Sequence, residues 1–259
     1  GDMDQRVFIY AYGAVPAVVM GHEYLPPEIV TIPSWASLVT STFLHGGWMH
    51  ILGNMLFLWI YGDNVEDRMG RVKFLMFYLI CGVAASLTHV MIDPNSTTPL
   101  VGASGAISGV MAAYIMMFPR ARIRVIMVII VFVRFTYFPA FVVIGIWAIL
   151  QIIAVPQSLS SSGGGVAYFA HIGGFVAGLA LTPFFKKSGT TLFPKTTDIP
   201  DETALNNRPN EWDITPVPAR QVRNEFIARY QRKPRRVDIP TTKKSAPKEA
   251  AKTDHEIKP

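Results

Sequence analysis

Five stretches of this chain carry almost no charge and approach the length needed to cross a lipid bilayer. They cover residues 38–61, 74–91, 99–118, 138–155 and 166–185. A membrane-spanning helix needs about 20 mostly apolar residues. Because hydrocarbon offers no hydrogen bonds to the backbone, such runs predict helices that pack into a bundle. We therefore expect an all-α polytopic membrane protein with five transmembrane helices in this sequence.

Charge and composition set the tail apart from the rest. Half of the residues are hydrophobic and the mean hydropathy is +0.30, which is high for a soluble domain. Residues 186–259 hold 16 Lys and Arg against 10 Asp and Glu, whereas residues 1–185 hold eight of each. The basic excess therefore indicates a soluble tail and no nucleic-acid-binding surface on the core. The single cysteine, Cys81, excludes an intrachain disulfide.

We expect three parts along the chain. Residues 1–36 mix charges and prolines with short apolar pieces, which predicts an extracytoplasmic loop or interfacial segment. Residues 37–185 form the membrane core, in which the short apolar piece 125–133 is expected to lie at the interface. Residues 186–259 have few large apolar residues, which predicts a mostly disordered cytoplasmic tail. Residues 219–231 have the spacing of an amphipathic helix for anionic lipid or a partner, and equally of a solvated face.

The loops between the runs predict the orientation, since Lys and Arg stay on the cytoplasmic side. Two connections and the tail are basic, and the two connections carry Arg68, Arg71, Lys73, Arg120, Arg122 and Arg124. The other two connections, residues 93–98 and 156–165, hold no Lys or Arg. We therefore expect residues 1–36 outside. An external amino terminus with five spans requires a signal peptide or an earlier crossing, so we expect a helix before this sequence.

Polar side chains inside predicted spans indicate function, because they are costly in hydrocarbon. Ser104 and His171 each lie about five residues from the external end of their run, which predicts a shared depth of roughly 7–8 Å. Both runs also carry pairs of small residues that allow close helix packing, Gly105 with Gly109 and Gly174 with Gly178. Packing alone would explain the small residues. If the two faces meet, however, the imidazole can take the proton of the serine hydroxyl and make it a nucleophile.

Acyl transfer also needs hydrogen-bond donors for the developing oxyanion. His50 and Asn54 are four residues apart and so share a helical face, and the backbone N–H of Ser104 offers a further donor. The alternative for this pair is a polar clamp between helices. His45 is expected at a loop end, and Gln151 is expected to be a structural hydrogen-bonding residue. Neither run that carries Ser104 or His171 contains Asp or Glu, so we expect a dyad without a carboxylate.

Four segments in this order resemble the rhomboid family of intramembrane serine proteases. They are FLHGGWMHILGN at 43–54, GDNVEDRMG at 62–70, GASG at 102–105 and AHIGG at 170–174. The resemblance covers residues 6–185 and implies a rhomboid-like helical bundle. It also implies that Ser104 is the nucleophile and His171 the general base. The oxyanion hole would be formed by His50, Asn54 and the backbone N–H of Ser104.

The resemblance further implies that Glu66 and Arg68 belong to a structural hydrogen-bond network on the inner loop. Two departures from the family matter. Its common core has six helices, and we expect the first of these to be missing from this sequence. Some relatives also have an aromatic residue one turn below the nucleophile that stacks on the histidine, whereas this chain has Ser108. The ring of His171 must therefore be held by another group.

We expect an intramembrane serine endopeptidase that cleaves transmembrane segments of membrane proteins in the bilayer, without a metal or organic cofactor. The chain is expected to be a multi-pass protein of a prokaryotic cell membrane. The alternative is an inactive rhomboid-like protein that binds transmembrane helices, which predicts loss of a catalytic residue, whereas Ser104 and His171 are both present. A transporter with histidine proton relays would show paired charges or repeated halves, and the sequence has neither.

Overall fold

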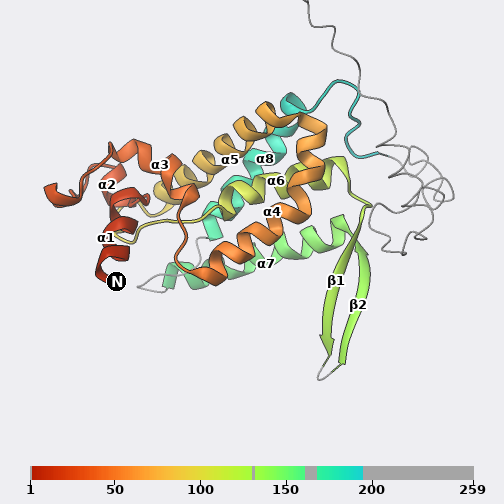
Figure 1. Ribbon diagram of the computed structural model, residues 1–259, viewed down its shortest axis with the longest axis horizontal. Helices are drawn as coiled ribbons and strands as arrows, with labels where there is room; N and C mark the ends of the chain where they lie inside the picture. The colour runs from red at the N-terminus through yellow and green to blue at the C-terminus, as the bar shows by residue number, and fades with distance from the viewer. Residues whose placement is uncertain (1, 130–131, 161–167, 195–259) are drawn as a thin grey trace, which may run out of the picture. The chain divides into compact units, whose positions relative to one another are not determined.

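The computed structural model describes residues 2–129, 132–160 and 168–194, and this part of the chain is mainly helical (Figure 1). Short helical turns lie at Pro27–Ile29, Ser34–Ala36 and Ser41–Phe43. The α-helices are α1 (Asp2–Tyr12), α2 (Pro16–Val19), α3 (Ser37–Thr40), α4 (Trp48–Met69), α5 (Arg71–Ile92), α6 (Ser104–Met117), α7 (Ala140–Ser160) and α8 (Tyr168–Phe185). The strands are β1 (Arg122–Ile129) and β2 (Phe132–Pro139).

Helix α6 is the centre of the bundle. It packs against α4, α5, α7 and α8 (Figure 1). Every residue of α6 is buried except Ser104 and Ile115, which are partly exposed. A helix that is apolar on all sides belongs in a core, because it has no face that favours water. The residue that opens α6 is thus held by a helix that is almost entirely buried.

Glycines allow α6 to approach its neighbours closely. A Cβ on Gly174 would collide with the carbonyl oxygen of Gly105, and one on Gly178 would collide with that of Gly109. On the other side of α6, a Cβ on Gly105 would lie 2.5 Å from Ala85 Cβ of α5. Close backbone approach of this kind is typical of helix pairs in membranes. It sets the spacing between the helices that carry Ser104 and His171.

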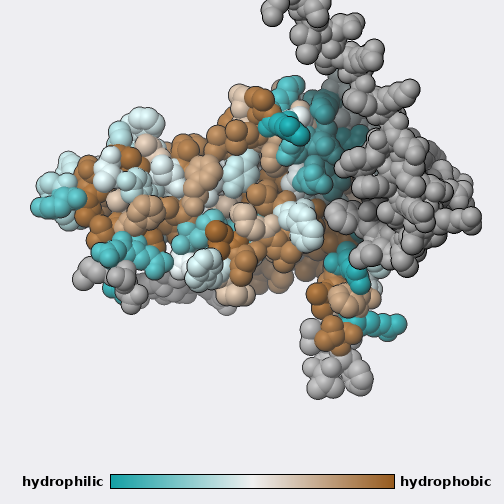
Figure 2. All heavy atoms as spheres, in the orientation of Figure 1, coloured by the Kyte–Doolittle hydropathy of each residue, from teal (hydrophilic) through white to brown (hydrophobic). Residues whose placement is uncertain are grey.

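The outer surface of the bundle is rich in apolar side chains (Figure 2). Trp59 of α4, Ile152 of α7 and Phe184 of α8 are 71%, 62% and 78% exposed, respectively. Exposed large apolar side chains in such number mark contact with a membrane or another protein. Among the described residues, α5 and α8 are long and apolar enough to cross a bilayer, and α6 and residues 140–156 are apolar but shorter. The count of five transmembrane helices stays a prediction.

The prediction of an all-α protein was wrong for residues 122–139, including the piece expected to be interfacial. Strands β1 and β2 form an antiparallel hairpin, with Arg124 opposite Tyr137 and Met127 opposite Arg134. These strands are rich in Val, Ile and aromatic residues, which favour strands over helices. The guanidinium of Arg124 lies over the ring of Phe135, 4.3 Å from its centroid. The helix after the hairpin therefore begins at Ala140, and not at residue 138.

Two helix starts also differ from the predictions. The helix in the first predicted span, α4, begins at Trp48 instead of residue 38, because short turns and the Gly46-Gly47 pair, poor in helix propensity, precede it. It continues to Met69, beyond the predicted end at residue 61, and Gly70 then joins it to α5 with a φ of +88°. The third run does not become helical at residue 99, since Leu100 pairs with Ala14 as an isolated β-bridge.

The two flanking parts contain more structure than predicted. Residues 1–36, expected to form a loop or an interfacial segment, contain the 11-residue helix α1 and the short helix α2. The start of the predicted disordered tail packs back on the bundle: the N–H of Lys187 donates to the carbonyl of Arg68 at 2.7 Å, and that of Phe193 to Met116 at 2.7 Å. Residues 195–259, with the possible amphipathic helix at 219–231, lie outside the described residues.

Candidate active site

Ser104 is the first residue of α6, and the chain before it is held by its backbone. Leu100 and Ala14 exchange two hydrogen bonds, of 2.8 and 3.1 Å, and the N–H of Gly102 donates to the carbonyl of Ser41 at 2.9 Å. Gly102 has a φ of +129°, a conformation that favours glycine. The first N–H groups of a helix have no partner within it. Ser104 thus sits where unpaired backbone donors are concentrated.

His171 lies in the first turn of α8 and faces Ser104. The distance between its Nε2 and Ser104 Oγ is 2.8 Å, within hydrogen-bond range. Its other ring nitrogen, Nδ1, lies 2.7 Å from Oε1 of Gln151 on α7. Three helices therefore contribute one residue each to a continuous line of hydrogen bonds, from Gln151 through His171 to Ser104.

Aromatic side chains surround the imidazole. The ring centroid of Trp147, one turn before Gln151 on α7, lies 6.1 Å from that of His171 at an interplanar angle of 40°. Tyr168 approaches edge-on, with its centroid at 6.4 Å. Ser108, at the position where some rhomboids have an aromatic residue, donates instead to the carbonyl of Ser104 at 2.7 Å. The ring contacts of His171 therefore come from aromatic residues of α7 and α8, whereas α6 contributes the hydroxyl of Ser104.

His50 and Asn54 both lie on α4, and His50 contacts the chain just before Ser104. A Cβ on Gly102 would lie 2.8 Å from Cε1 and Nε2 of His50, so the imidazole packs directly on the chain before Ser104. Asn54 is 7% exposed, and its Nδ2 is a buried donor for which the described residues supply no hydrogen-bond acceptor. Buried polar groups without partners are rare and call for an explanation. The Asn54 amide is therefore a donor that remains available for a ligand oxygen.

A family model supplies the identification. The model of the Rhomboid domain matches residues 33–188, which include Ser104, His171, His50 and Asn54. The chain belongs to the rhomboid family. Rhomboids are integral membrane proteins that act on transmembrane substrates in the bilayer.

Individual rhomboids match over shorter ranges. Rhomboid-like protein 11, chloroplastic, of Arabidopsis thaliana is 40% identical over 31% of this chain and 28% of its own length. Rhomboid protease GluP of Bacillus subtilis is 36% identical over 33% of this chain and 16% of its own length. Rhomboid protein 1, mitochondrial, of Saccharomyces cerevisiae is 31% identical over 36% of this chain and 28% of its own length. The chain thus spans less than a third of these relatives. Since they include chloroplastic and mitochondrial proteins, the comparisons do not support the predicted prokaryotic cell membrane.

Two other predicted residues of this rhomboid, Glu66 and Arg68, lie away from Ser104 and His171. Glu66 and Arg68 lie in the last turn of α4, at the opposite end of that helix from His50. Glu66 forms an ion pair with Arg71 at 3.6 Å, and the Arg68 guanidinium lies 5.3 Å from the centroid of the Phe118 ring. Their predicted role in a structural network stays a prediction.

His45 precedes α4 in a loop, and its ring centroid lies 5.2 Å from that of His50. Burial is the main cause that lowers the pKa of His45, and the neighbouring His50 adds to the effect. A neutral His45 is therefore favoured beside His50.

The reasoning from equal depth was wrong in one premise. Ser104 does not lie one turn inside a helix that begins at residue 99; it opens α6 after an extended segment. The sequence predicted Gln151 to be a structural hydrogen-bonding residue but did not identify the His171 ring as its partner. The available signal was an isolated amide near the predicted external end of an apolar run, one turn after Trp147.

Across residues 2–129, 132–160 and 168–194, no three His, Cys, Asp or Glu side chains are grouped to hold a metal ion.

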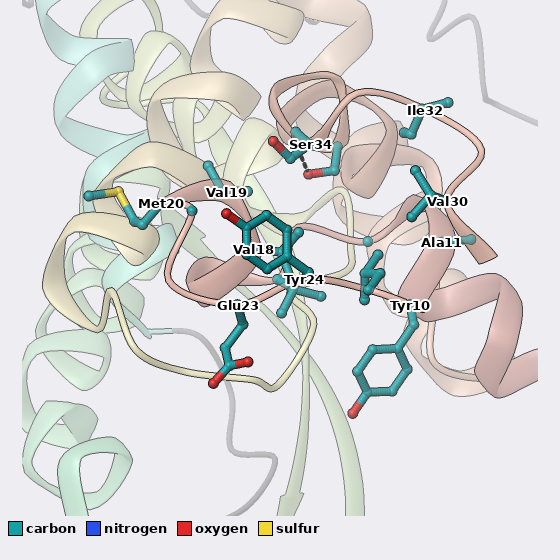
Figure 3. A pocket seen from close by; sticks show the side chains of 15 residues that line it. Tyr10, Ala11, Val18, Val19, Met20, Glu23, Tyr24, Val30, Ile32 and Ser34 are labelled. Atoms are coloured by element: carbon teal, nitrogen blue, oxygen red, sulfur yellow. Dashed lines mark hydrogen bonds between the residues drawn. The ribbon is translucent and has the colours of Figure 1, made fainter. Parts of the chain in front are cut away.

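A separate pocket of about 350 Å³ lies in the amino-terminal segment, where Figure 3 shows Tyr24 and Glu23 beside Val18 and Val19. Its lining residues all lie between Tyr10 and Ser37, so it contains none of the four candidate residues of the active site.

Proposed function

We propose that this rhomboid is an intramembrane serine endopeptidase that cleaves transmembrane segments of other membrane proteins. The proposal rests above all on the 2.8 Å hydrogen-bond distance between Ser104 Oγ and His171 Nε2. A serine hydroxyl is a weak nucleophile at neutral pH unless a base within hydrogen-bond reach takes its proton. Membership of a family that includes named proteases supports the same reaction.

The reaction follows from these two groups. Ser104 Oγ attacks the carbonyl carbon of the scissile peptide bond while its proton passes to His171 Nε2. The C–N bond then breaks, His171 returns the proton to the leaving amine, and the acyl group stays on Ser104 as an ester. Water attacks the ester, giving its proton to His171, and the departing Ser104 oxygen takes that proton back. The cycle consumes one water molecule and returns Ser104 and His171 to their starting protonation states.

The oxyanion would be stabilised by three donors, namely the Nδ2 amide of Asn54, the ring N–H of His50 and the backbone N–H of Ser104. The buried and unpartnered Nδ2 of Asn54 supports this role, since a substrate oxygen would satisfy it. Removal of a single donor of this type typically costs about 10²–10³ in kcat.

The membrane arrangement is part of the proposal. Helices α4 to α8 would form the five spans and residues 37–185 the protease core, with residues 186–259 as a cytoplasmic tail. The apolar outer surface of α4, α7 and α8 supports this arrangement. Peptide bonds within a helix are shielded by their own hydrogen bonds, so the substrate segment must unwind locally before attack.

The test compares wild-type protein with Ser104→Ala in proteoliposomes that contain a model single-pass substrate. We expect cleavage to fall by at least about 10³-fold. Labelling by a serine-directed fluorophosphonate should be lost as well. Ser86→Ala, a buried serine of α5, is the matched control and should keep both activities.

Persistent cleavage by Ser104→Ala would refute the assignment. If the wild-type protein bound the substrate but neither cleaved it nor reacted with fluorophosphonate, the inactive helix-binding alternative would replace the protease.

A further inference from the structure

The hydrogen-bonded line at the site does not end at the histidine, because Gln151 contacts the ring nitrogen remote from Ser104. Gln151 Oε1 lies 2.7 Å from His171 Nδ1, on the side opposite the 2.8 Å contact of Nε2 with Ser104. We propose that Gln151 is a positioning residue that fixes the tautomer and orientation of the general base. This inference rests on the proposed protease function and deepens it.

The amide of Gln151 has one preferred direction. Its Nε2 lies 3.5 Å from the carbonyl oxygen of Trp147, one turn earlier on α7, and donates to it. Its Oε1 therefore faces the imidazole, and a carbonyl oxygen has no proton to give. The proton of the contact must then lie on Nδ1 of His171.

This placement decides the state of the other nitrogen. A neutral imidazole carries one proton, so a proton on Nδ1 leaves a lone pair on Nε2. Nε2 is then able to accept the hydroxyl proton of Ser104 at 2.8 Å. In the opposite tautomer, Nε2 would carry a proton and could not act as a base. Gln151 thus favours the reactive form of the dyad.

The surroundings suit a neutral acceptor. Helices α6, α7 and α8 contain no Asp or Glu, so no carboxylate from them can take the place of the amide. The titratable groups that face the His171 ring are His50 from α4 and Tyr168 from α8, and α7 carries none. An amide selects the tautomer without introducing a charge into an apolar bundle, where an unpaired charge is costly. With Trp147 from the same helix, Gln151 replaces the ring contact that Ser108 cannot make.

Two substitutions separate this role from simple packing. Gln151→Met keeps the length of the side chain but removes the strong acceptor, whereas Gln151→Glu keeps an acceptor and adds charge. The matched control is Ile152→Met, the next residue of α7, which is 62% exposed. Each variant is reconstituted as the full chain, and kcat, KM, thermal stability and the pH profile are measured with the model substrate.

We expect Gln151→Met to lower kcat at least about tenfold, a part of the 10²–10⁴ that general-base catalysis contributes. KM and thermal stability should match those of Ile152→Met. Gln151→Glu should recover activity, and its acid limb should move to higher pH, because a carboxylate at Nδ1 favours the charged imidazolium. Equal kcat values for Gln151→Met and Ile152→Met would overturn the proposal.

A measurement independent of turnover distinguishes this proposal from the proposed function. Nitrogen-15 NMR of histidine-labelled protein, with His171 assigned by its absence in His171→Ala, reports which ring nitrogen is protonated. We expect protonated Nδ1 in wild type and a mixture in Gln151→Met. A proton on Nε2 in wild type, or an unchanged tautomer in Gln151→Met, would refute the role of Gln151. Absence of any wild-type cleavage would refute the protease function, and the spectrum would still decide on Gln151.

Discussion

The contact between α6 and α8 makes a sharp prediction for Gly174→Ala. Gly174 lies three residues after His171, and an added Cβ would lie 2.8 Å from the carbonyl carbon of Gly105 and would collide with its oxygen. Non-bonded carbon atoms are best separated by about 3.5–4.0 Å, so the two helix backbones must part by about 1 Å. Both clashing atoms are backbone atoms, so no side-chain rotation can relieve the overlap.

The same displacement acts on the active site. A shift of about 1 Å would lengthen the 2.8 Å contact of Ser104 Oγ with His171 Nε2 beyond the range of a hydrogen bond. We expect kcat to fall by about 10²-fold, the typical cost of a misplacement of this size. Overpacking of a tight contact also costs about 1–3 kcal/mol of unfolding free energy, which lowers Tm by roughly 2–12 °C.

Gly145→Ala of α7 is the matched control, since no atom lies within 4 Å of its added Cβ. Alanine in an open helical position is expected to preserve or slightly raise stability. The assays are cleavage of a model transmembrane substrate in proteoliposomes and thermal unfolding in detergent. If Gly174→Ala matched Gly145→Ala in both kcat and Tm, the glycine contact would not set the geometry of the dyad.

Two further predictions concern other buried groups. Asn54→Ala should lower kcat by about 10²–10³-fold with little change in Tm, because it removes a donor without an acceptor among the described residues; steady-state kinetics that stay within twofold of wild type would contradict the oxyanion role. Cys81, the single cysteine, is fully buried against Gly109, so a maleimide should label it only after unfolding; rapid labelling of folded protein in detergent would mean that the packing of α5 on α6 is looser than described.

Hydropathy predicted best those helices that begin and end where the apolar run begins and ends. The runs 74–91 and 166–185 closely match α5 and α8. It failed for α4, whose end is set by Gly70 and not by the loss of apolar residues, so the helix continues through Asp63 and Glu66. For residues 122–139 hydropathy could not distinguish a short apolar helix from a strand, and the β-branched residues decided the outcome.

The candidate site also contains residues that the sequence predicts and a contact that it does not. The serine and the histidine stand out because a polar residue is costly in an apolar run, and the helix packing that brings them within 2.8 Å follows from the small residues beside them. Their catalytic roles stay predictions until activity is measured. The contact of Gln151 depends on how α7 leans on α8, a tertiary feature without a local pattern in the sequence. Its partner is 20 residues away, across a helix–helix connection.

The approach to Ser104 carries a consequence for how this chain tolerates change. The strand-like entry is tied down at Ala14, Ser41 and Leu100 through peptide N–H and carbonyl groups. Every residue except proline offers both groups, so most substitutions at these positions leave the backbone hydrogen bonds available. The nucleophile is thus insulated from most substitutions in the segments that hold it.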